Sequence, residues 1–196
     1  MRRACAAAFG VLLLAVAAGC APAARAPLDR IEALDDGEMI VVGRVELVPP
    51  LRKGEQRIRG IGTAGLENRM LLIVDERSRP LPRDLAISDY AGRVEAPLGE
   101  TFFVRSRGAP FHVLGGVLFL DFGGDTQQRA YFPGGLQVDA RPGDRAVYIG
   151  TLRYHRDEFF EVSRVTVVDD YAEANAEFTR KFGSRHVLRK SLMKRK

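Results

Sequence analysis

The chain has 196 residues, of which 46% are hydrophobic and 28% are charged, and its formal net charge is +5. This length and composition fit one soluble globular domain that is large enough to bury a core. They exclude a membrane-spanning segment beyond residue 20, because no second long apolar run follows the first.

The first twenty residues have the layout of a secretory signal peptide. Arg2 and Arg3 precede an apolar run that ends in small residues and Cys20. A transmembrane anchor needs about 20 apolar residues, whereas the run from Ala4 to Gly19 contains only sixteen residues. The ending Ala17-Ala18-Gly19-Cys20 resembles the lipobox of bacterial lipoproteins, which implies that Cys20 is acylated and becomes the first residue of the mature chain. Cleavage near Ala17 or Ala18, as in a plain signal peptide, is the alternative.

A short tether is predicted to separate Cys20 from the folded domain. Residues 21–29 are mostly small, include two prolines and show no hydrophobic period. The expected divisions are a signal peptide over 1–19, the acylated cysteine and tether over 20–37, a domain over 38–183 and a basic tail over 184–196. Cys5 and Cys20 are the only cysteines, so we expect the exported domain to fold without a disulfide.

The domain is predicted to consist of short β-strands separated by turns. Runs rich in β-branched and aromatic residues are divided by glycine, proline and polar residues. The expected strands are 39–48, 69–75, 101–105, 111–114, 117–122, 129–132, 136–139, 146–154 and 159–168. Pro142-Gly143 fits the centre of a type II turn. The polar sequence His155-Arg156-Asp157-Glu158 is expected to be the tip of a hairpin formed by the last two strands.

One helix is predicted after the last strand, over residues 170–182. Its apolar residues recur at spacings of three and four and line one face; they are Tyr171, Ala174, Phe178 and Phe182. Asp170 and Glu173 have the spacing of a capping box, and Gly183 fits the residue after a helix. About nine strands followed by one helix predict a mainly β fold, an antiparallel β-sandwich with a C-terminal α-helix. A small closed β-barrel is the alternative.

The end of the chain is strongly basic, although the rest of the mature chain is mildly acidic. Residues 20–179 contain 20 Lys and Arg against 25 Asp and Glu, whereas residues 180–196 contain eight basic residues and no acidic one. The basic residues are Arg180, Lys181, Arg185, Arg189, Lys190, Lys194, Arg195 and Lys196.

Two interpretations of this end stay open. One is a disordered terminus. The other is an electrostatic contact with anionic lipid headgroups or an acidic protein, in which the segment forms a short basic amphipathic helix. The apolar residues of that helix would be Val187, Leu188, Leu192 and Met193. Nucleic acid is not an expected partner, because the chain is predicted to be exported.

Parts of three predicted strands, together with the residues next to them, carry a resemblance to known proteins. These stretches are residues 37–45, 147–152 and 167–171. They resemble small bacterial envelope lipoproteins of uncharacterised function, which are similar to transthyretin-like or carboxypeptidase-regulatory-like sandwiches. The resemblance covers about half of the chain and implies the fold only; Cys20 is the one functional residue that a resemblance supplies. By resemblance to enterobacterial sorting, Ala21 after the cysteine implies an outer-membrane location facing the periplasm.

The sequence contains no recognisable catalytic or metal-binding constellation. None of its serines lies in Gly-x-Ser-x-Gly, and a triad would have to be assembled from scattered residues. His155, Asp157 and Glu158 form the densest group of metal-ligand types, but charged residues are expected at a hairpin tip in any case. Residues 51–67, rich in glycine and arginine, predict a surface loop, with anion binding as the less favoured alternative. No catalytic residue, cofactor or metal is therefore assigned.

These observations favour a non-catalytic, membrane-anchored periplasmic lipoprotein that acts as a structural or partner-binding subunit of a cell-envelope assembly. Its expected partners are the lipid bilayer, through acylated Cys20, and an envelope protein. The alternative is a small-ligand or glycan-binding module that uses residues 51–67 or an aromatic face, and a hydrolase is less favoured. A deep pocket with converging polar groups would support binding or catalysis, whereas an exposed apolar patch would support partner binding.

Overall fold

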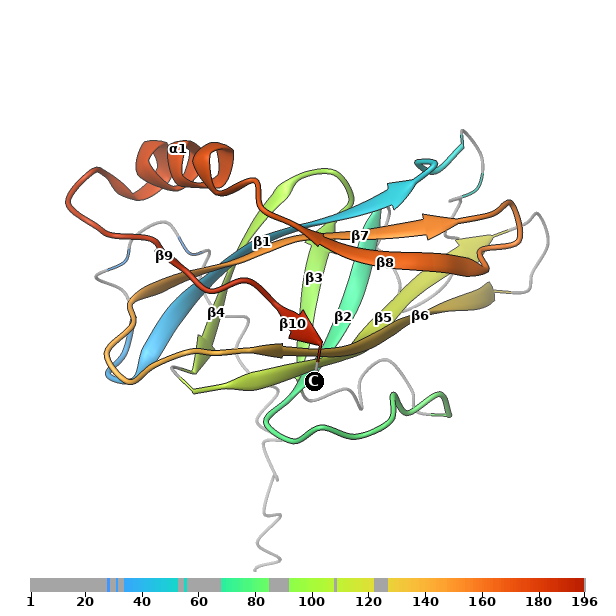
Figure 1. Cartoon of the computed structure of the whole chain (residues 1–196), viewed down its shortest axis with the longest axis horizontal. Coiled ribbons are helices and arrows are strands. Elements are labelled where there is room, and N and C mark those ends of the chain that lie inside the picture. Colours follow the sequence, from blue (N-terminus) through green and yellow to red (C-terminus); the bar gives the residue numbers. More distant parts are fainter. Residues whose placement is uncertain are drawn as a thin grey trace, which may run out of the picture.

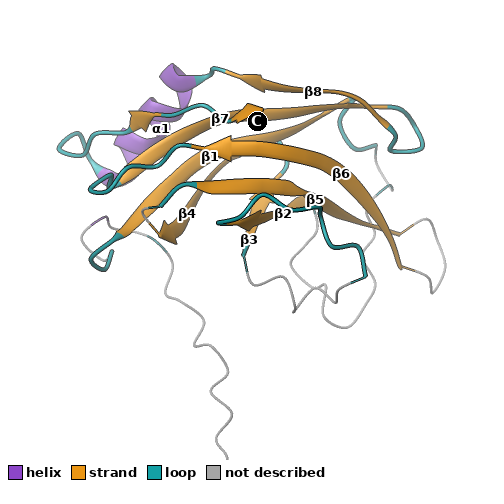
Figure 2. Cartoon of the chain, turned by 60° about the horizontal axis from the view of Figure 1, so that its bottom comes forward, coloured by secondary structure: helices purple, strands orange, loops and turns teal. Residues whose placement is uncertain are grey.

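The computed structural model describes residues 28, 31, 34–52, 55, 68–84, 92–107, 109–121 and 127–195, with 121 and 127 described by their backbone alone. The elements are β1 (Glu38–Val48), β2 (Arg69–Asp75), β3 (Arg93–Pro97), β4 (Thr101–Arg107), β5 (Phe111–Asp121), β6 (Gln127–Val138), β7 (Ala146–Arg156), β8 (Val162–Val168), α1 (Tyr171–Phe182), β9 (Arg189–Lys190) and β10 (Lys194–Arg195). They build two facing β-sheets, with α1 outside one of them (Figure 1 and Figure 2).

The first sheet has the strand order β4-β1-β7-β8, with β9 also paired to β7, and the second sheet has the order β10-β6-β5-β2-β3. The predicted β-sandwich with one C-terminal helix is therefore confirmed. Neither sheet closes on itself within the described residues, so the alternative of a closed barrel is not observed. None of the described helices is long and apolar enough to cross a bilayer.

The pairing of β1 with β7 is parallel, which the predicted antiparallel arrangement did not include. Ile40 lies opposite Ala146 and Val48 lies opposite His155, so the two strands run side by side over most of their length. The register shifts between Val42 and Arg44, where a Cβ on Gly43 would lie 2.8 Å from the Phe102 ring. Gly43 thus allows the close approach that this bulge requires.

Strand β1 is buried on both faces, because the first sheet is covered on both sides. Met39 and Val41 belong to the apolar core between the sheets. Ile40 and Val42 point the other way and pack with residues of α1. Such burial on both faces is typical of a parallel pair, whereas an antiparallel pair often leaves one face in water.

The two sheets are joined across the core by an aromatic contact. Tyr154 on β7 is fully buried, and its ring meets the Phe132 ring of β6 edge to face at 5.0 Å. The Tyr154 hydroxyl donates a hydrogen bond of 3.1 Å to the carbonyl oxygen of Pro133, so its polar atom is satisfied inside the core. Burial raises the pKa of this hydroxyl far above its usual value, which keeps it protonated as the donor.

Four predicted strands form only two in the structure, because β5 and β6 each continue through the glycines that separated the predicted strands. β5 passes through Gly115-Gly116, and β6 passes through Pro133-Gly134-Gly135. A Cβ on Gly115 would lie 2.5 Å from the carbonyl oxygen of Phe132, and the register of the pair shifts between Val113 and Gly115. The glycines permit a bulge within two long strands and do not form turns.

The apolar face of α1 packs on the first sheet as predicted. Phe178 is 0% exposed and Ala174 is 4% exposed, and both contact a cluster that includes Tyr148. The predicted capping box does not form, because the Asp170 side chain makes no capping hydrogen bond. Glu173 is instead engaged by Arg44 of β1, at 2.8 Å.

The residues after α1 belong to the sandwich. The segment 188–195, which we call the C-terminal strap, pairs first with β7 through β9 and then with β6 through β10. It buries Leu188 to 1% and Met193 to 4% exposure. The tail expected over 184–196 thus contributes strands to both sheets, and in this structure the segment is not helical.

We predict that Phe178→Ala lowers the free energy of unfolding by about 3–5 kcal/mol, because it removes a fully buried ring. Phe159→Ala is the matched control, since Phe159 is 77% exposed and its loss should cost less than about 0.5 kcal/mol. Urea unfolding of both variants measures the difference. Equal losses would contradict the packing of α1 on the sheet.

Candidate functional site

A small hollow under the first turns of α1 has the polar lining that a binding site would need. It is lined by Gly43, Arg44, Thr101, Tyr148, Thr151, Asp170 and Ala174. Pockets for drug-sized ligands enclose roughly 300–1,000 Å³. This hollow has no room for even one water molecule, so it cannot hold such a ligand. The Arg44 guanidinium is bonded to its neighbours through its two terminal nitrogens, whereas its Nε has no hydrogen-bond partner among the described residues.

Arg44 is the main charged group in this hollow, and it joins β1 to α1. Its guanidinium donates two hydrogen bonds to the Glu173 carboxylate, at 2.8 and 3.2 Å, and one to Glu177 at 3.4 Å. A further hydrogen bond of 3.1 Å reaches the Thr101 hydroxyl. The hydrogen bond from Arg44 also lowers the pKa of the Glu173 carboxyl. The cluster therefore fastens the helix to the sheet.

The predicted group of His155, Asp157 and Glu158 does not converge on one point. The His155 ring lies beside the Arg164 guanidinium, with N–N distances of 3.1 and 3.3 Å. Partial desolvation and the nearby arginines lower the pKa of His155. Asp157 Oδ1 accepts backbone N–H groups within its own turn. No cluster of three metal-ligand types occurs in the described part of the chain.

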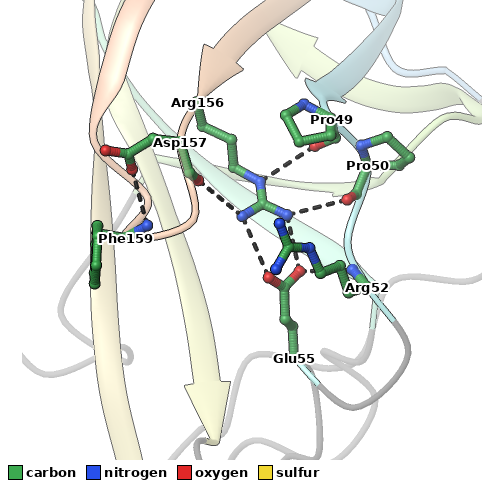
Figure 3. Close-up of polar contacts among 7 residues, drawn as sticks. All are labelled: Pro49, Pro50, Arg52, Glu55, Arg156, Asp157 and Phe159. Carbon is green, nitrogen blue, oxygen red and sulfur yellow. Dashed lines mark hydrogen bonds and ion pairs between the residues drawn. The ribbon is translucent and has the colours of Figure 1, made fainter.

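The most densely bonded side chain in the described structure is Arg156, at the end of β7 (Figure 3). Its side chain is 0% exposed and forms an ion pair of 2.8 Å with Glu55. The guanidinium also donates hydrogen bonds of 3.2, 3.0 and 3.2 Å to the carbonyl oxygens of Pro49, Pro50 and Asp157. Arg156 thus ties the β7–β8 turn to the chain that leaves β1.

The two phenylalanines of the β7–β8 turn lie in opposite environments. The Phe160 ring is buried, with the Arg156 guanidinium 4.2 Å from its centroid. Phe159 is 77% exposed. Asp157 Oδ1 accepts the N–H groups of Phe159 and Glu161, both at 2.8 Å, and so fixes the turn. The turn holds one aromatic ring inside and presents the other to solvent.

The loop predicted over 51–67 lies mostly outside the described residues. Its beginning is described and is held in place: the N–H of Arg52 donates to the Glu55 carboxylate at 2.6 Å. Burial alone would raise the pKa of the Glu55 carboxyl, but hydrogen bonds from Arg52 and Arg156 lower it overall. Anion binding by this loop stays the less favoured alternative, which the described residues do not test.

The predicted basic residues of the tail divide into two groups. Arg189 donates through Nε and Nη2 to the two carboxylate oxygens of Asp144 and also through Nη2 to the carbonyl of Asp139, while Lys190 pairs with Asp169 at 2.8 Å. The ion pairs of these two cations attach the C-terminal strap to the rest of the domain.

The other basic residues of the tail that the structure describes are exposed. Lys181 lies over the Phe103 ring at 5.2 Å, and Arg195 makes one long hydrogen bond to a carbonyl of β8. Arg180, Arg185 and Lys194 form no ion pair with another described residue. Lys196 and Cys20 lie outside the described residues.

The described N-terminal residues are fixed at one end of the sandwich, close to the exposed cations. Leu28, Ile31 and Leu34 belong to the apolar cluster that contains Phe178 and Leu188. Arg145 donates to the carbonyl oxygens of Ile31, Leu34 and Asp35, at 3.2, 3.3 and 3.4 Å. Figure 1 places the C-terminal end of α1 at this end and the β7–β8 turn at the other.

The sequence did not predict that Arg44 and Arg156 connect separate elements of the fold through ion pairs. Both lie in strands where arginine is expected to face solvent, and their carboxylate partners are distant in sequence. No local spacing rule connects such pairs. The placement of Arg156 directly before a turn with two phenylalanines is the only hint, because a buried guanidinium often lies against an aromatic face.

Comparisons with protein-family models, curated proteins and solved structures found no match. The resemblance of the strand motifs to envelope lipoproteins therefore stays a prediction. The function has to be argued from the geometry of the described residues and from the N-terminal sequence.

We predict that Arg156→Met destabilises the protein by about 3–5 kcal/mol, because it leaves the Glu55 carboxylate without its ion-pair partner and three carbonyls without their donor. Arg153→Met is the matched control. Arg153 pairs with Glu46 at 2.8 Å but is 34% exposed, so its loss should cost about 0–1 kcal/mol. Chemical unfolding of both variants would refute the structural role of Arg156 if it gave similar values.

We also predict that acidification weakens the attachment of the strap. The hydrogen bond from Arg189 lowers the pKa of Asp144 in the folded state, so this carboxylate stabilises the fold above the unfolded pKa of about 3.9. That contribution is lost as the pH falls through the lower, folded pKa. Asp144→Asn should therefore lose stability at neutral pH and show a shallower decline with acid than the unmodified protein. Parallel pH profiles of unfolding free energy would contradict this.

Proposed function

We propose that this protein is a lipid-anchored lipoprotein of the bacterial cell envelope, which acts without catalysis as a partner-binding or structural subunit of an envelope assembly. The observation that carries the proposal is the common location of its N-terminal attachment and its exposed cations. Leu28 and Ile31 pack in the same apolar cluster as Leu188, next to the exposed end of α1. An anchor at Cys20 would therefore bring the end of the sandwich that carries Arg180, Lys181 and Arg185, which we call the basic end, towards the bilayer.

The length of the tether supports this arrangement. Cys20 precedes Leu28 by eight residues, which span at most about 27–29 Å when fully extended. Arg180, Lys181 and Arg185 lie at the end of α1 and in the following loop, and Val187 in that loop is 81% exposed. Each cation near an anionic membrane surface contributes about 1 kcal/mol to binding. The basic end is thus suited to rest on headgroups while the acyl chains hold the protein.

The interior of the described domain supports a non-catalytic role. The hollow beside Arg44 is small, the buried Arg156 guanidinium is bonded to a carboxylate and to carbonyls of the fold, and the partly buried Arg44 guanidinium is bonded to two carboxylates and a hydroxyl. Catalytic sites need groups that are free to meet a substrate in a water-excluding cleft. The described polar groups instead connect one element to another, as expected of a rigid binding scaffold.

The anchor is tested by the mature N-terminus. We predict that mass spectrometry of the native protein finds an acylated Cys20 as the first residue, and that Cys20→Ser leaves the protein unprocessed or released from membranes. An unmodified N-terminus beyond residue 20 would exclude lipidation. Ala21→Ser is a suitable control, because it keeps a small residue next to the thiol.

The basic end is tested with acyl-free protein and vesicles of phosphatidylglycerol and phosphatidylethanolamine. We predict that Arg180→Glu with Arg185→Glu weakens vesicle binding more than Lys194→Glu with Arg195→Glu, because the second pair lies on β10, away from that end. Binding should also weaken as added salt shortens the screening length to about 10 Å or less.

Equal effects of the two charge pairs, or binding that ignores salt, would contradict the contact. Truncation after Gly183 is not a suitable test. It would remove the buried Leu188 and Met193, and with them the strands of the strap.

A further inference from the structure

We propose that the β7–β8 turn, residues 157–161, is the docking site for a partner protein. The surface of that partner would offer an apolar pocket for the Phe159 ring, bordered by basic side chains. This inference rests on the proposed role as a partner-binding subunit and assigns the surface that carries it out.

The exposure of Phe159 is the first observation. Its side chain is 77% exposed, and Val48, which lies opposite His155 in the neighbouring strand, is 38% exposed at the same end. A single exposed apolar residue is ordinary on a protein surface. The surroundings of Phe159 are what make this one unusual.

The turn is built so that Phe159 cannot fold back onto the domain. The Phe160 ring already occupies the buried position, stacked on the Arg156 guanidinium at 4.2 Å. Phe160 adopts a φ of +64°, a conformation that bulky residues rarely adopt. Asp157 fixes the backbone of the turn. Its Oδ1 accepts the N–H groups of Phe159 and Glu161, and its own N–H donates to the Glu161 carbonyl.

The base of the turn is equally rigid. Arg156 is fully buried and bonded to Glu55 and to the carbonyls of Pro49 and Pro50 (Figure 3). A turn whose backbone is already held in one conformation loses little entropy when it docks. Large aromatic residues in such positions frequently dominate the binding energy of an interface.

The charge of the turn indicates the kind of partner. Asp157, Glu158 and Glu161 are exposed carboxylates, whereas Arg156 is buried and neutralised by Glu55. Arg164, further along β8, lies against the His155 ring. Carboxylates around the exposed ring oppose its insertion among anionic headgroups and favour a partner whose pocket has a basic border.

The position of the turn agrees with this assignment. In Figure 1 it lies at the end of the sandwich opposite to the C-terminal end of α1, where Leu28 and Ile31 pack with Leu188. In the proposed anchored arrangement, the turn therefore points away from the bilayer and is accessible to other envelope proteins.

The first experiment uses fluorescence, because the chain contains no tryptophan. In Phe159→Trp, the single indole should emit as a water-exposed group, and its spectrum should not change with protein concentration or with vesicles of phosphatidylglycerol and phosphatidylethanolamine. A blue shift with vesicles would mean that the ring enters lipid, and a blue shift with concentration would mean self-association. Either result would overturn the inference.

The second experiment places a benzoylphenylalanine photo-crosslinker at position 159 of the full-length chain in intact envelopes, with position 187 as the matched exposed control. We expect a discrete protein adduct from position 159 that does not form from position 187. An adduct to lipid, an adduct to a second copy of this chain, or the absence of a 159-specific adduct would overturn the proposal.

The captured protein is then purified and titrated with variants of the turn. Phe159→Ala should weaken binding at least about tenfold. Glu158→Lys with Glu161→Lys should slow association at low salt, and Val187→Ala should change neither. Unchanged affinity of Phe159→Ala would contradict docking through this ring. Because the exposed ring makes little contribution to folding, loss of binding by this variant would not reflect unfolding.

The acylation state of Cys20 in the same samples separates the two proposals. An acylated protein without a 159-specific adduct would refute the docking site and leave the lipoprotein role intact. A protein with a 159-specific adduct but an unmodified N-terminus would refute the anchor and keep the docking site.

Discussion

The parallel pairing of β1 with β7 is the constraint on which the rest of the fold depends. Parallel neighbours cannot be joined by a tight turn and need a crossover connection. In this protein, residues 49–145 form that crossover and contain β4 together with β2, β3, β5 and β6, four of the strands of the second sheet. Because β1 and β7 are apolar on both faces, one face requires the second sheet and the other requires α1 and the N-terminal residues.

Local patterns were sufficient to predict most of the elements. Strand β1, strand β2 and the β7–β8 hairpin follow from runs of β-branched residues, and the apolar stripe of α1 follows from its spacing. The parallel pairing was not predictable, because alternation of apolar residues reports which face is buried and not which strand lies alongside. The glycines of β5 and β6 misled the prediction, since glycine marks a close approach within a bulge as well as a turn.

The candidate site was less predictable than the fold. The basic tail was recognised by its charge, but its alternation of cations and apolar residues fits an extended strap as well as a helix. Leu188 and Met193 are buried while Lys190 and Lys194 are exposed. Phe159 and Phe160 are adjacent and chemically identical, so only the turn geometry shows that one is part of the core and the other is presented to solvent.

The C-terminal strap also has a consequence for the order in which the domain can be completed. A chain that emerges from the ribosome or from a translocation channel does so from its N-terminus. Its partial sheets would lack β9 and β10 until residues 189–195 appear. Leu188 and Met193, which fill apolar sites on opposite sides of the first sheet, arrive equally late. The two sheets therefore lack their last strands, and the apolar sites for Leu188 and Met193 stay unfilled, until the C-terminal strap is available for pairing.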